Sequence, residues 1–374
     1  MKKIGILTYQ KSFNYGAMLQ VYASQKVIDK FGYEGYIVNY ENDEEKKENK
    51  LFSYRKDKKI IENIKNFIRN VFFDSYRIRK NNFNDFGNRL RKTSKVNSTE
   101  EIEEKLSDKI DIFVAGSDQI WNPAITGSEF EKAFLLDFNA KKKISYASSA
   151  GSHLYNDEEI KYIKKALKDF KHISVRECFL KDQLEKAGIS NVKVVLDPTL
   201  LLTSKEWRED CYDESILKEV PNKFILVYLL EPYNEFCANI ILKLKNKFNL
   251  PIVYIGFTNR KKKNIDINLT NVTPERFVTL IDHAECIVTD SFHGNAFAVN
   301  MKTNLYSILN PSNPKRVENF LSNLDLKTRI ITDEKDIDNI PFDVKYVKAE
   351  EKLSIERRES IEYLTNALSG KETK

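Results

Sequence analysis

Short apolar segments alternate with amphipathic helical segments along almost the whole chain, and this alternation constrains the fold most. Apolar runs at residues 3–9, 143–147, 224–230 and 252–256 each end in a polar turn that leads towards a segment with helical spacing of apolar residues, and the run at 111–115 also ends in a polar turn. In such chains the apolar runs form a parallel sheet and the helices cover its faces. The pattern runs through both halves, which predicts an α/β protein with two Rossmann-like, doubly wound domains that face a cleft.

The length of 374 residues is sufficient for two domains with cores of their own. We expect an N-terminal Rossmann-like domain over residues 1–200, with a basic helical insertion at about 43–95. A C-terminal Rossmann-like domain is expected over residues 201–345, and a final helix and tail over 346–374. The final helix, at about 350–367, is predicted to pack on one of the two domains.

The positive charge of the chain is concentrated in the insertion. The whole chain has a net charge of +6, whereas residues 43–95 contain 16 Lys and Arg and 8 Asp and Glu, a local charge of +8. Residues 60–72 carry an apolar stripe, which fits a helix packed on the body of the protein with a solvated basic face. The same segment also fits a surface helix that rests on anionic lipid headgroups or binds an anionic substrate. No nucleic-acid-binding motif is recognisable, so we expect no nucleic acid partner.

The remaining bulk features favour a cytoplasmic protein. The four cysteines are far apart and form no CxxC pair, which predicts reduced thiols and neither a disulfide framework nor a zinc site. The N-terminal residues run directly into a strand without the features of a signal peptide, and no apolar run is long enough to cross a bilayer. We see no group of ligands that demands a metal. The oligomeric state is not predicted.

The stretch from Glu285 to Ala296 is the strongest candidate for a functional site. It is predicted to contain a buried strand at 286–288, a polar turn, and a helix that starts at Ala296. Ligands of open α/β sheets bind outside the carboxyl ends of strands, where helix N-termini favour anions. A lone histidine is more often structural than catalytic, but this setting and the neighbouring Asp290 and Ser291 favour a functional role for His293.

Other polar loops follow predicted strands in the first half of the chain. They are 14–16, 116–119, 148–149 and 176–177. Glycine and serine end strands in many proteins, and an isolated arginine such as Arg176 is more often part of a surface ion pair than of a ligand site. Together the loops predict a site between the domains, although their spacing does not identify a substrate. The first of these loops lacks the GxGxxG fingerprint of dinucleotide-binding domains.

The order of these motifs resembles the polysaccharide pyruvyl transferase family over about residues 3–330, with the insertion at 43–95 and the tail past 335 outside the resemblance. The segments that carry the resemblance are NYGA at 14–17, GSDQIWN at 116–122, SYAS at 145–148, SVRE at 174–177, DPT at 197–199 and TDSFHG at 289–294. The resemblance implies a two-domain fold like that of GT-B glycosyltransferases. It also implies transfer of the enolpyruvyl carbons of phosphoenolpyruvate onto two hydroxyls of a sugar, with formation of a cyclic ketal and release of phosphate.

Several donor-site roles follow from the resemblance. His293 matches the functional histidine of the family, and Arg176 matches an arginine of its phosphoenolpyruvate site. Some members have an arginine two residues before the histidine, where this chain has Ser291. The missing cation could come from Lys315 or Arg316, which fit a solvated loop equally well. Backbone N–H groups at Gly294 and Asn295 are expected to complete the anion site.

The chemistry assigns further roles. We expect His293 to be the general acid that protonates the enol carbon. Asp290 either orients the imidazole or caps the following helix. Asp118 and Gln119 are predicted to hold acceptor hydroxyls, and Trp121 either stacks on a sugar ring or packs in the core. The other residues expected to line the acceptor site are Asn14, Tyr15, Gly16, Ser117 and Ser148.

The sequence therefore favours a phosphoenolpyruvate-dependent pyruvyltransferase of surface-polysaccharide synthesis, without a cofactor besides this co-substrate. Its acceptor would be a nucleotide-linked or lipid-linked sugar, and a lipid-linked one would place segment 43–95 at the inner face of the membrane. One alternative is a GT-B glycosyltransferase that uses a nucleotide sugar. Another is a non-catalytic binding or scaffold protein of the same pathway.

Overall fold

The computed structural model describes residues 1–42, 46, 74–127, 129–309 and 314–370. The chain divides into two compact units, and each is described by itself. Among the described residues, unit 1 contains 1–42, 46, 84–127, 129–201 and 356–370, and unit 2 contains 74–83, 202–309 and 314–355. The observed division thus falls between Leu201 and Leu202, beside the predicted domain boundary at 200/201.

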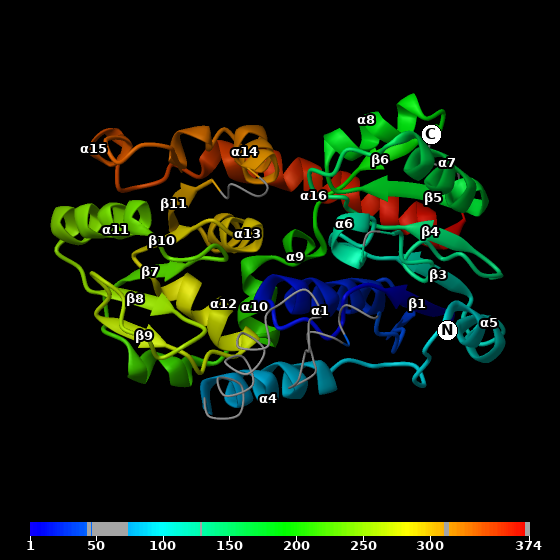
Figure 1. The fold of residues 1–374 in the computed structure, drawn as a ribbon, viewed down its shortest axis with the longest axis horizontal. Helices are drawn as coiled ribbons and strands as arrows, with labels where there is room; N and C mark the ends of the chain where they lie inside the picture. The colour runs from blue at the N-terminus through cyan, green and yellow to red at the C-terminus, as the bar shows by residue number, and fades with distance from the viewer. Residues whose placement is uncertain (43–45, 47–73, 128, 310–313, 371–374) are drawn as a thin grey trace, which may run out of the picture. The chain divides into compact units, whose positions relative to one another are not determined.

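Unit 1 is built on a parallel sheet of six strands in the order β2–β1–β3–β4–β5–β6 (Figure 1). The strands β1 and β3 are almost entirely buried, as expected for parallel strands with both faces covered. The order reverses direction between β1 and β3. The bounds are β1 (Lys3–Leu7), β2 (Glu34–Ile37), β3 (Ile112–Ala115), β4 (Lys143–Ser145), β5 (Phe170–Val175) and β6 (Val192–Val194).

The helices of unit 1 begin where the sequence supplies caps. Asn14 accepts a hydrogen bond from the N–H of Ala17 at the start of α1, and Asn156 and Glu159 form a capping box at the start of α7. The helices are α1 (Tyr15–Lys30), α5 (Thr99–Leu106), α6 (Pro123–Thr126), α7 (Asp157–Ala166), η1 (Leu167–Asp169), α8 (Cys178–Lys186) and α9 (Pro198–Leu201). Two more helices, α4 (Asp74–Asn88) and α16 (Val347–Ser369), contribute residues to both units.

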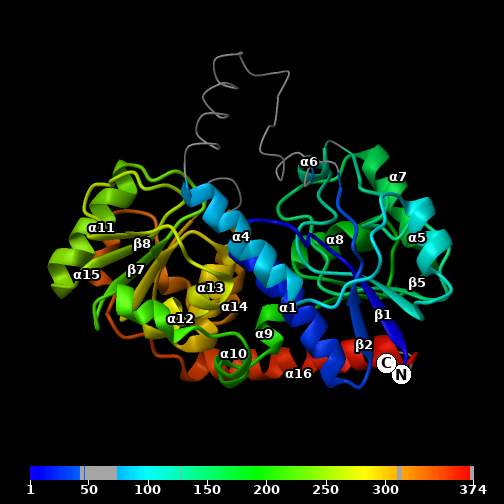
Figure 2. The same cartoon turned by 90° about the horizontal axis from the view of Figure 1, so that it is seen from below.

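Unit 2 contains a second parallel sheet of six strands, in the order β12–β11–β10–β7–β8–β9. This is the strand order of Rossmann folds, and it reverses between the neighbours β7 and β10. Figure 2 shows α11 and α15 on one side of this sheet and α12 and α13 on the other. The strands are β7 (Ile225–Tyr228), β8 (Ile252–Ile255), β9 (Ile267–Leu269), β10 (Cys286–Thr289), β11 (Asn304–Ile308) and β12 (Ile330–Ile331).

The helices of unit 2 bury apolar faces against this sheet. Buried residues of α11 pack with alternate residues of β7, β8 and β10 in one core cluster, whereas α13 is buried along its whole length. The bounds are α10 (Ser204–Asp210), η2 (Glu214–Glu219), α11 (Glu235–Phe248), α12 (Pro274–His283), α13 (Phe292–Met301), α14 (Pro314–Asn323), η3 (Lys327–Arg329) and α15 (Asp336–Asn339).

The predicted fold class, two doubly wound α/β domains, is confirmed by the two sheets. The predicted start of one helix is wrong: α13 begins at Phe292 and not at Ala296, so His293 lies in its first turn. The strands β9 and β12 were not predicted, since they have only three and two residues. The predicted apolar stripe at 60–72 lies outside the described residues. Within the described part of the chain, no helix has the length and apolarity that a membrane span requires.

Candidate functional site

The reversal of strand order in unit 2 is the first place to look for a ligand site, because the loops after the two central strands diverge there. Asp290 follows β10 and connects the end of this strand to the loop after β7. Its Oδ1 accepts the N–H of Leu230 at 2.7 Å, and its Oδ2 accepts the N–H of Glu231 at 2.9 Å, just beyond the end of β7. Burial raises the pKa of Asp290, although these two hydrogen bonds lower it. Both carboxylate oxygens therefore hold the loop after β7.

The N-terminus of α13 is shaped by three residues of the predicted motif. Ser291 is its N-cap, with Oγ accepting the N–H of Gly294 at 3.3 Å, so the alternative in which Asp290 caps the helix is wrong. A Cβ at Gly294 would lie 2.5 Å from Oγ1 of Thr289, so a side chain here would separate the helix from the end of β10. The glycine thus lets the helix start directly against the strand. This position brings the positive end of the helix dipole to the carboxyl edge of the sheet.

His293 occupies the first turn of this helix and is 6% exposed. The ring of Phe292 lies 5.2 Å from the imidazole, edge to face. The guanidinium of Arg316 lies 5.1 Å from the centroid of the same Phe292 ring. Arg316, in the first turn of α14, thus lies close to the His293 turn, whereas Lys315 is exposed.

Two further polar side chains are buried near this turn. The Oδ1 of Asn295 and the Oγ of Ser307 are buried and have no hydrogen-bond partner among the described residues. The Nδ2 of Asn295 donates to the carbonyl of Ser291 at 2.8 Å, and Ser307 pairs in register with Thr289 on the neighbouring strand. A buried polar atom without a partner is costly, and it often marks a place where a ligand or water binds. Ser307 was not a predicted site residue.

The reversal of strand order in unit 1, between β1 and β3, lies between two of the predicted loops. Asn14 follows β1 and is half-buried, and Asp118 and Gln119 follow β3 and are also half-buried. Asp118 has a φ of 77°, in the left-handed region, and its Oδ1 accepts the N–H of Gln119 at 2.8 Å. A non-glycine residue in this conformation stores strain that is common at functional sites.

Four other predicted acceptor residues of unit 1 are buried inside it. Trp121 is fully buried and its Nε1–H donates to the carbonyl of Phe134 at 3.1 Å, so the prediction that it stacks on a sugar is wrong and its alternative, core packing, holds. Tyr15 is 2% exposed and Gly16 is buried beside it, which contradicts a lining role for both in this conformation. The hydroxyl of Ser148 is buried as well, and it donates to the carbonyls of Ala115 and Gly116.

Arg176 lies in a buried network of polar side chains after β5. Its Nε donates to Glu177 at 3.0 Å, its Nη1 to Asp197 at 2.9 Å and its Nη2 to Ser149 at 3.2 Å. Burial lowers the pKa of Arg176. The nearby carboxylates, among which Glu177 has the largest effect, raise this pKa by more than burial lowers it, so the guanidinium stays charged. Ser117 Oγ also donates to Asp197, at 2.9 Å.

These contacts constrain the predicted donor role of Arg176. Two carboxylates already offset its charge, so the guanidinium attracts an additional anion less than an unpaired one would. The contacts favour a structural role, and binding of phosphoenolpyruvate by Arg176 stays a prediction. One oxygen of the network, Oε2 of Glu177, is buried without a hydrogen-bond partner among the described residues. Glu177 and Asp197 belong to motifs of the sequence, but they were not predicted as site residues.

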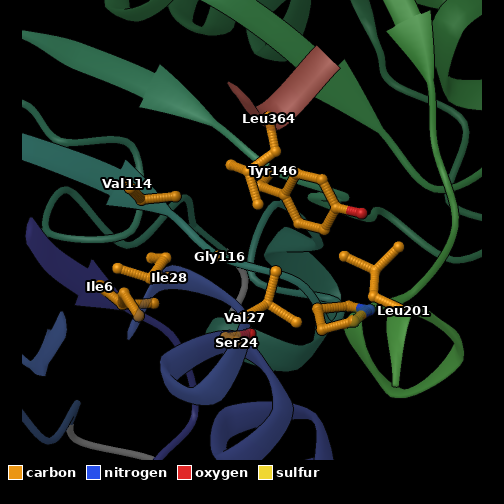
Figure 3. Close-up of a pocket in the computed structure, with 10 residues that line it drawn as sticks. Ile6, Ser24, Val27, Ile28, Val114, Gly116, Tyr146, Leu201 and Leu364 are labelled. Atoms are coloured by element: carbon orange, nitrogen blue, oxygen red, sulfur yellow. The ribbon is translucent and has the colours of Figure 1, made fainter. Parts of the chain in front are cut away.

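A small pocket in unit 1 lies elsewhere (Figure 3). Its lining is mostly aliphatic: Ile6, Ser24, Val27, Ile28, Val114, Gly116, Tyr146, Pro198, Leu201 and Leu364. The hydroxyl of Tyr146 donates to the carbonyl of Leu196 at 3.0 Å, and burial raises its pKa well above the usual value. The pocket therefore offers no acid or base for chemistry at neutral pH. Among the described residues, no group of His, Cys, Asp and Glu side chains is arranged to hold a metal.

A comparison with protein families gives one match, to the model described as polysaccharide pyruvyl transferase, over residues 14–313. The chain belongs to this family. The match contains the whole of the strand-order reversal in unit 2 and, from unit 1, the loop residues Asn14, Asp118 and Gln119. It also includes His293, Arg176 and the insertion, which was expected to lie outside the resemblance. The predicted resemblance is confirmed, and with it a transferase of polysaccharide synthesis. None of the curated proteins matches the chain.

Solved structures show that this family member has the fold of GT-B enzymes. A UDP-GlcNAc 2-epimerase from Methanocaldococcus jannaschii is similar with a TM-score of 0.55 and 14% identity, over 95% of this chain and 99% of that one. A UDP-GlcNAc 2-epimerase from Neisseria meningitidis, bound to UDP-GlcNAc, is similar with a TM-score of 0.52 and 12% identity, over 99% of this chain and 100% of that one. At these identities the similarity establishes the fold alone.

Proposed function

We propose that the chain is a phosphoenolpyruvate-dependent pyruvyltransferase that forms a pyruvate ketal on a sugar of a surface-polysaccharide precursor. The observation that carries the proposal is the place of His293, buried in the first turn of α13 at the point where the strand order of unit 2 reverses. Family membership supports pyruvyl transfer in general. The donor and the ketal are the specific parts of the proposal.

The donor would bind at the N-terminus of α13. Phosphoenolpyruvate carries a phosphate and a carboxylate, and a helix N-terminus stabilises one anionic group. Arg316 is proposed to supply the cation that Ser291 cannot, because its guanidinium lies against Phe292, next to His293. The buried Oγ–H of Ser307 and the amide of Asn295 are proposed to complete the polar surroundings.

His293 is proposed to donate a proton to C3 of the enol, which leaves an oxocarbenium-like centre at C2. A sugar hydroxyl forms a C–O bond to C2 and releases its proton to solvent, which replaces the proton that His293 gave. The C2–O bond to the phosphate then breaks, phosphate leaves, and the second hydroxyl attacks the same carbon and passes its proton to the leaving phosphate, which closes the ketal. A protonated histidine beside a phosphate suits this general-acid step, because the negative charge favours the imidazolium.

Asp118 and Gln119 remain the proposed acceptor contacts of unit 1, together with Asn14. They are half-buried at the reversal of strand order and offer oxygen and amide groups to sugar hydroxyls. A lipid-linked acceptor would fit an enzyme held at the inner face of the membrane by segment 43–95. Most of that segment lies outside the described residues. The membrane contact and the cytoplasmic location are both part of the proposal.

The function is tested by incubation of the protein with phosphoenolpyruvate and a panel of nucleotide-linked and lipid-linked sugars. A pyruvyltransferase releases phosphate only when the correct acceptor is present, and its product shows the methyl resonance of a ketal. The alternative glycosyltransferase would release a nucleoside diphosphate from a nucleotide sugar with no need for phosphoenolpyruvate. A scaffold protein would produce neither result.

A further inference from the structure

The loop between β8 and β9 presents a run of four cations, Arg260, Lys261, Lys262 and Lys263, at the carboxyl edge of the unit 2 sheet. Two of the four have local partners. Lys262 Nζ lies 5.4 and 5.3 Å from the ring centroids of Tyr233 and Tyr254, and Lys263 Nζ lies 3.7 Å from a carboxylate oxygen of Glu235.

Arg260 and Lys261 are different. Both are exposed, and neither has a carboxylate partner within ion-pair distance among the described residues. They therefore display two positive charges to solvent, next to Lys262, which lies against two tyrosine rings, and Lys263, which is exposed but paired with Glu235.

The loop is held in shape by the rest of unit 2. Asn268 Nδ2 donates to the carbonyl of Thr258 at 2.8 Å, and the hydroxyl of Tyr233 donates to the carbonyl of Lys263 at 2.6 Å. Gly256 leaves no room for a side chain beside Asn268 at the start of the loop. An anchored loop loses less entropy on binding than a mobile one would.

Apolar groups lie beside these charges. Phe257 is 36% exposed, and it is the only exposed phenylalanine in the part of the chain that the structure describes. The guanidinium of Arg79, on α4, lies 3.9 Å from its ring centroid. The residue before Arg79 is Ile78, which is 37% exposed. Asn82 holds this part of α4 on unit 2 through a hydrogen bond of 2.8 Å to Asn271.

We propose that this surface, defined by Phe257, Arg260, Lys261, Ile78 and Arg79, docks on the headgroup region of an anionic lipid bilayer. Exposed cations that flank an aromatic and an aliphatic side chain are the composition that binds at such an interface, because the cations attract anionic headgroups and the apolar groups enter the acyl boundary. Single-stranded nucleic acid also binds cations and aromatic rings, but an isolated ring and an aliphatic neighbour provide no series of stacking platforms.

The surface has a defined relation to His293. The carboxyl ends of β8 and β10 lie at the same edge of one sheet, with only β7 between them. Two strand spacings amount to about 10 Å. Docking through the Phe257 surface would therefore bring the edge that carries His293 towards the bilayer. A lipid-linked acceptor would then reach the site from the bilayer, which rests on the proposed function. The contact between the surface and lipid does not rest on it.

The test is co-sedimentation of the full chain with vesicles of phosphatidylcholine alone and of an equal mixture of phosphatidylcholine and phosphatidylglycerol. The protein should bind the mixed vesicles, with weaker binding as salt increases. The double substitution Arg260→Ser with Lys261→Ser should lower the partition coefficient about 30-fold. Phe257→Ser should weaken binding to the mixed vesicles, and the binding that remains should be more sensitive to salt.

A matched control is available in unit 1. Lys165 and Lys168 are exposed, and neither has an ion pair with another residue in the described part of the chain. Replacement of both by serine removes the same charge and should leave vesicle binding unchanged. The proposal is overturned if the wild type does not bind the mixed vesicles or if the control weakens binding equally. Binding of a single-stranded oligonucleotide in place of vesicles, lost in the Arg260 and Lys261 variant, would also overturn it. The assay needs no turnover, so it can fail while the proposed activity holds.

Discussion

The Nη1 of Arg176 donates to Oδ2 of Asp197 at 2.9 Å, and both side chains are almost fully buried. The same carboxylate holds the next turn of chain, because its Oδ1 accepts the N–H and the hydroxyl of Thr199. The pair therefore joins the ends of β5 and β6 in unit 1. Because the pair is buried, a structural role of Arg176 can be distinguished from a role in donor binding by its effect on stability.

Arg176→Ala should lower the free energy of unfolding by about 3–5 kcal/mol, because it leaves two buried carboxylates without their cation. Urea unfolding measures the change. Lys161→Ala is the control, since the ion pair of Lys161 with Glu158 is exposed and its loss should cost less than about 1 kcal/mol. Normal stability of Arg176→Ala, combined with loss of phosphoenolpyruvate binding, would assign Arg176 to the ligand instead.

Gly294→Ala should destabilise unit 2 by about 1–3 kcal/mol, because the new Cβ would overlap Oγ1 of Thr289. The measurement is again urea unfolding. Addition of Thr289→Ala removes the hydroxyl and should recover part of the loss. No recovery in the double variant would show that the close contact between these two residues is not the cause.

Asp290→Asn should cost about 1–3 kcal/mol of stability, because one amide N–H would replace a carboxylate oxygen that accepts the N–H of Leu230 or Glu231. If Asp290 acts only on this loop, turnover at a temperature well below unfolding should change little. A loss of turnover as large as that of a His293 variant, with small loss of stability, would indicate that Asp290 orients the imidazole.

His293→Gln should lower kcat by about 10²- to 10⁴-fold, the usual contribution of a general acid, and leave the fold intact. His153→Gln is the matched control, because His153 pairs with Glu159 at the start of α7 in unit 1. Phosphate release with a productive acceptor measures both. Equal rates in the two variants would exclude His293 as the acid.

The folded protein should lose stability as the pH rises from 10 to about 12. Burial raises the pKa of Tyr254 and Tyr306 to about 12, from 10.0 for an exposed tyrosine. Between these values the unfolded chain ionises and the folded chain does not, so a rise in pH favours unfolding. Circular dichroism and tyrosinate absorbance should change together. Tyr254→Phe should shift the transition to higher pH, and an unchanged transition would contradict this origin.

The two sheets are predictable from the sequence because apolar runs and helical spacing are local properties. Asn156 and Glu159, for example, mark the start of α7 only three residues apart in the chain. The motif at 289–294 also indicated a site, since it lies between a strand and a helix. Short strands such as β12 depend on pairing with β11, which no local pattern reveals.

The details of the site depend on contacts between distant residues. Nothing around Trp121 shows that its indole N–H bonds to Phe134, or that Asp197 lies against Arg176 from 21 positions away. Ser307 is separated from Thr289 by a whole helix and becomes its neighbour only through strand pairing. Burial and hydrogen bonding decide which polar residues serve the fold and which stay available to a ligand.

The central claim is most directly tested by calorimetric titration of phosphoenolpyruvate and, separately, of UDP-N-acetylglucosamine into the wild type, His293→Gln and His153→Gln proteins. A phosphoenolpyruvate-dependent enzyme should bind phosphoenolpyruvate as the wild type and as His153→Gln, and more weakly as His293→Gln, with no requirement for the nucleotide sugar. Binding of the nucleotide sugar to the wild type, with no binding of phosphoenolpyruvate, would contradict the account and favour a glycosyltransferase.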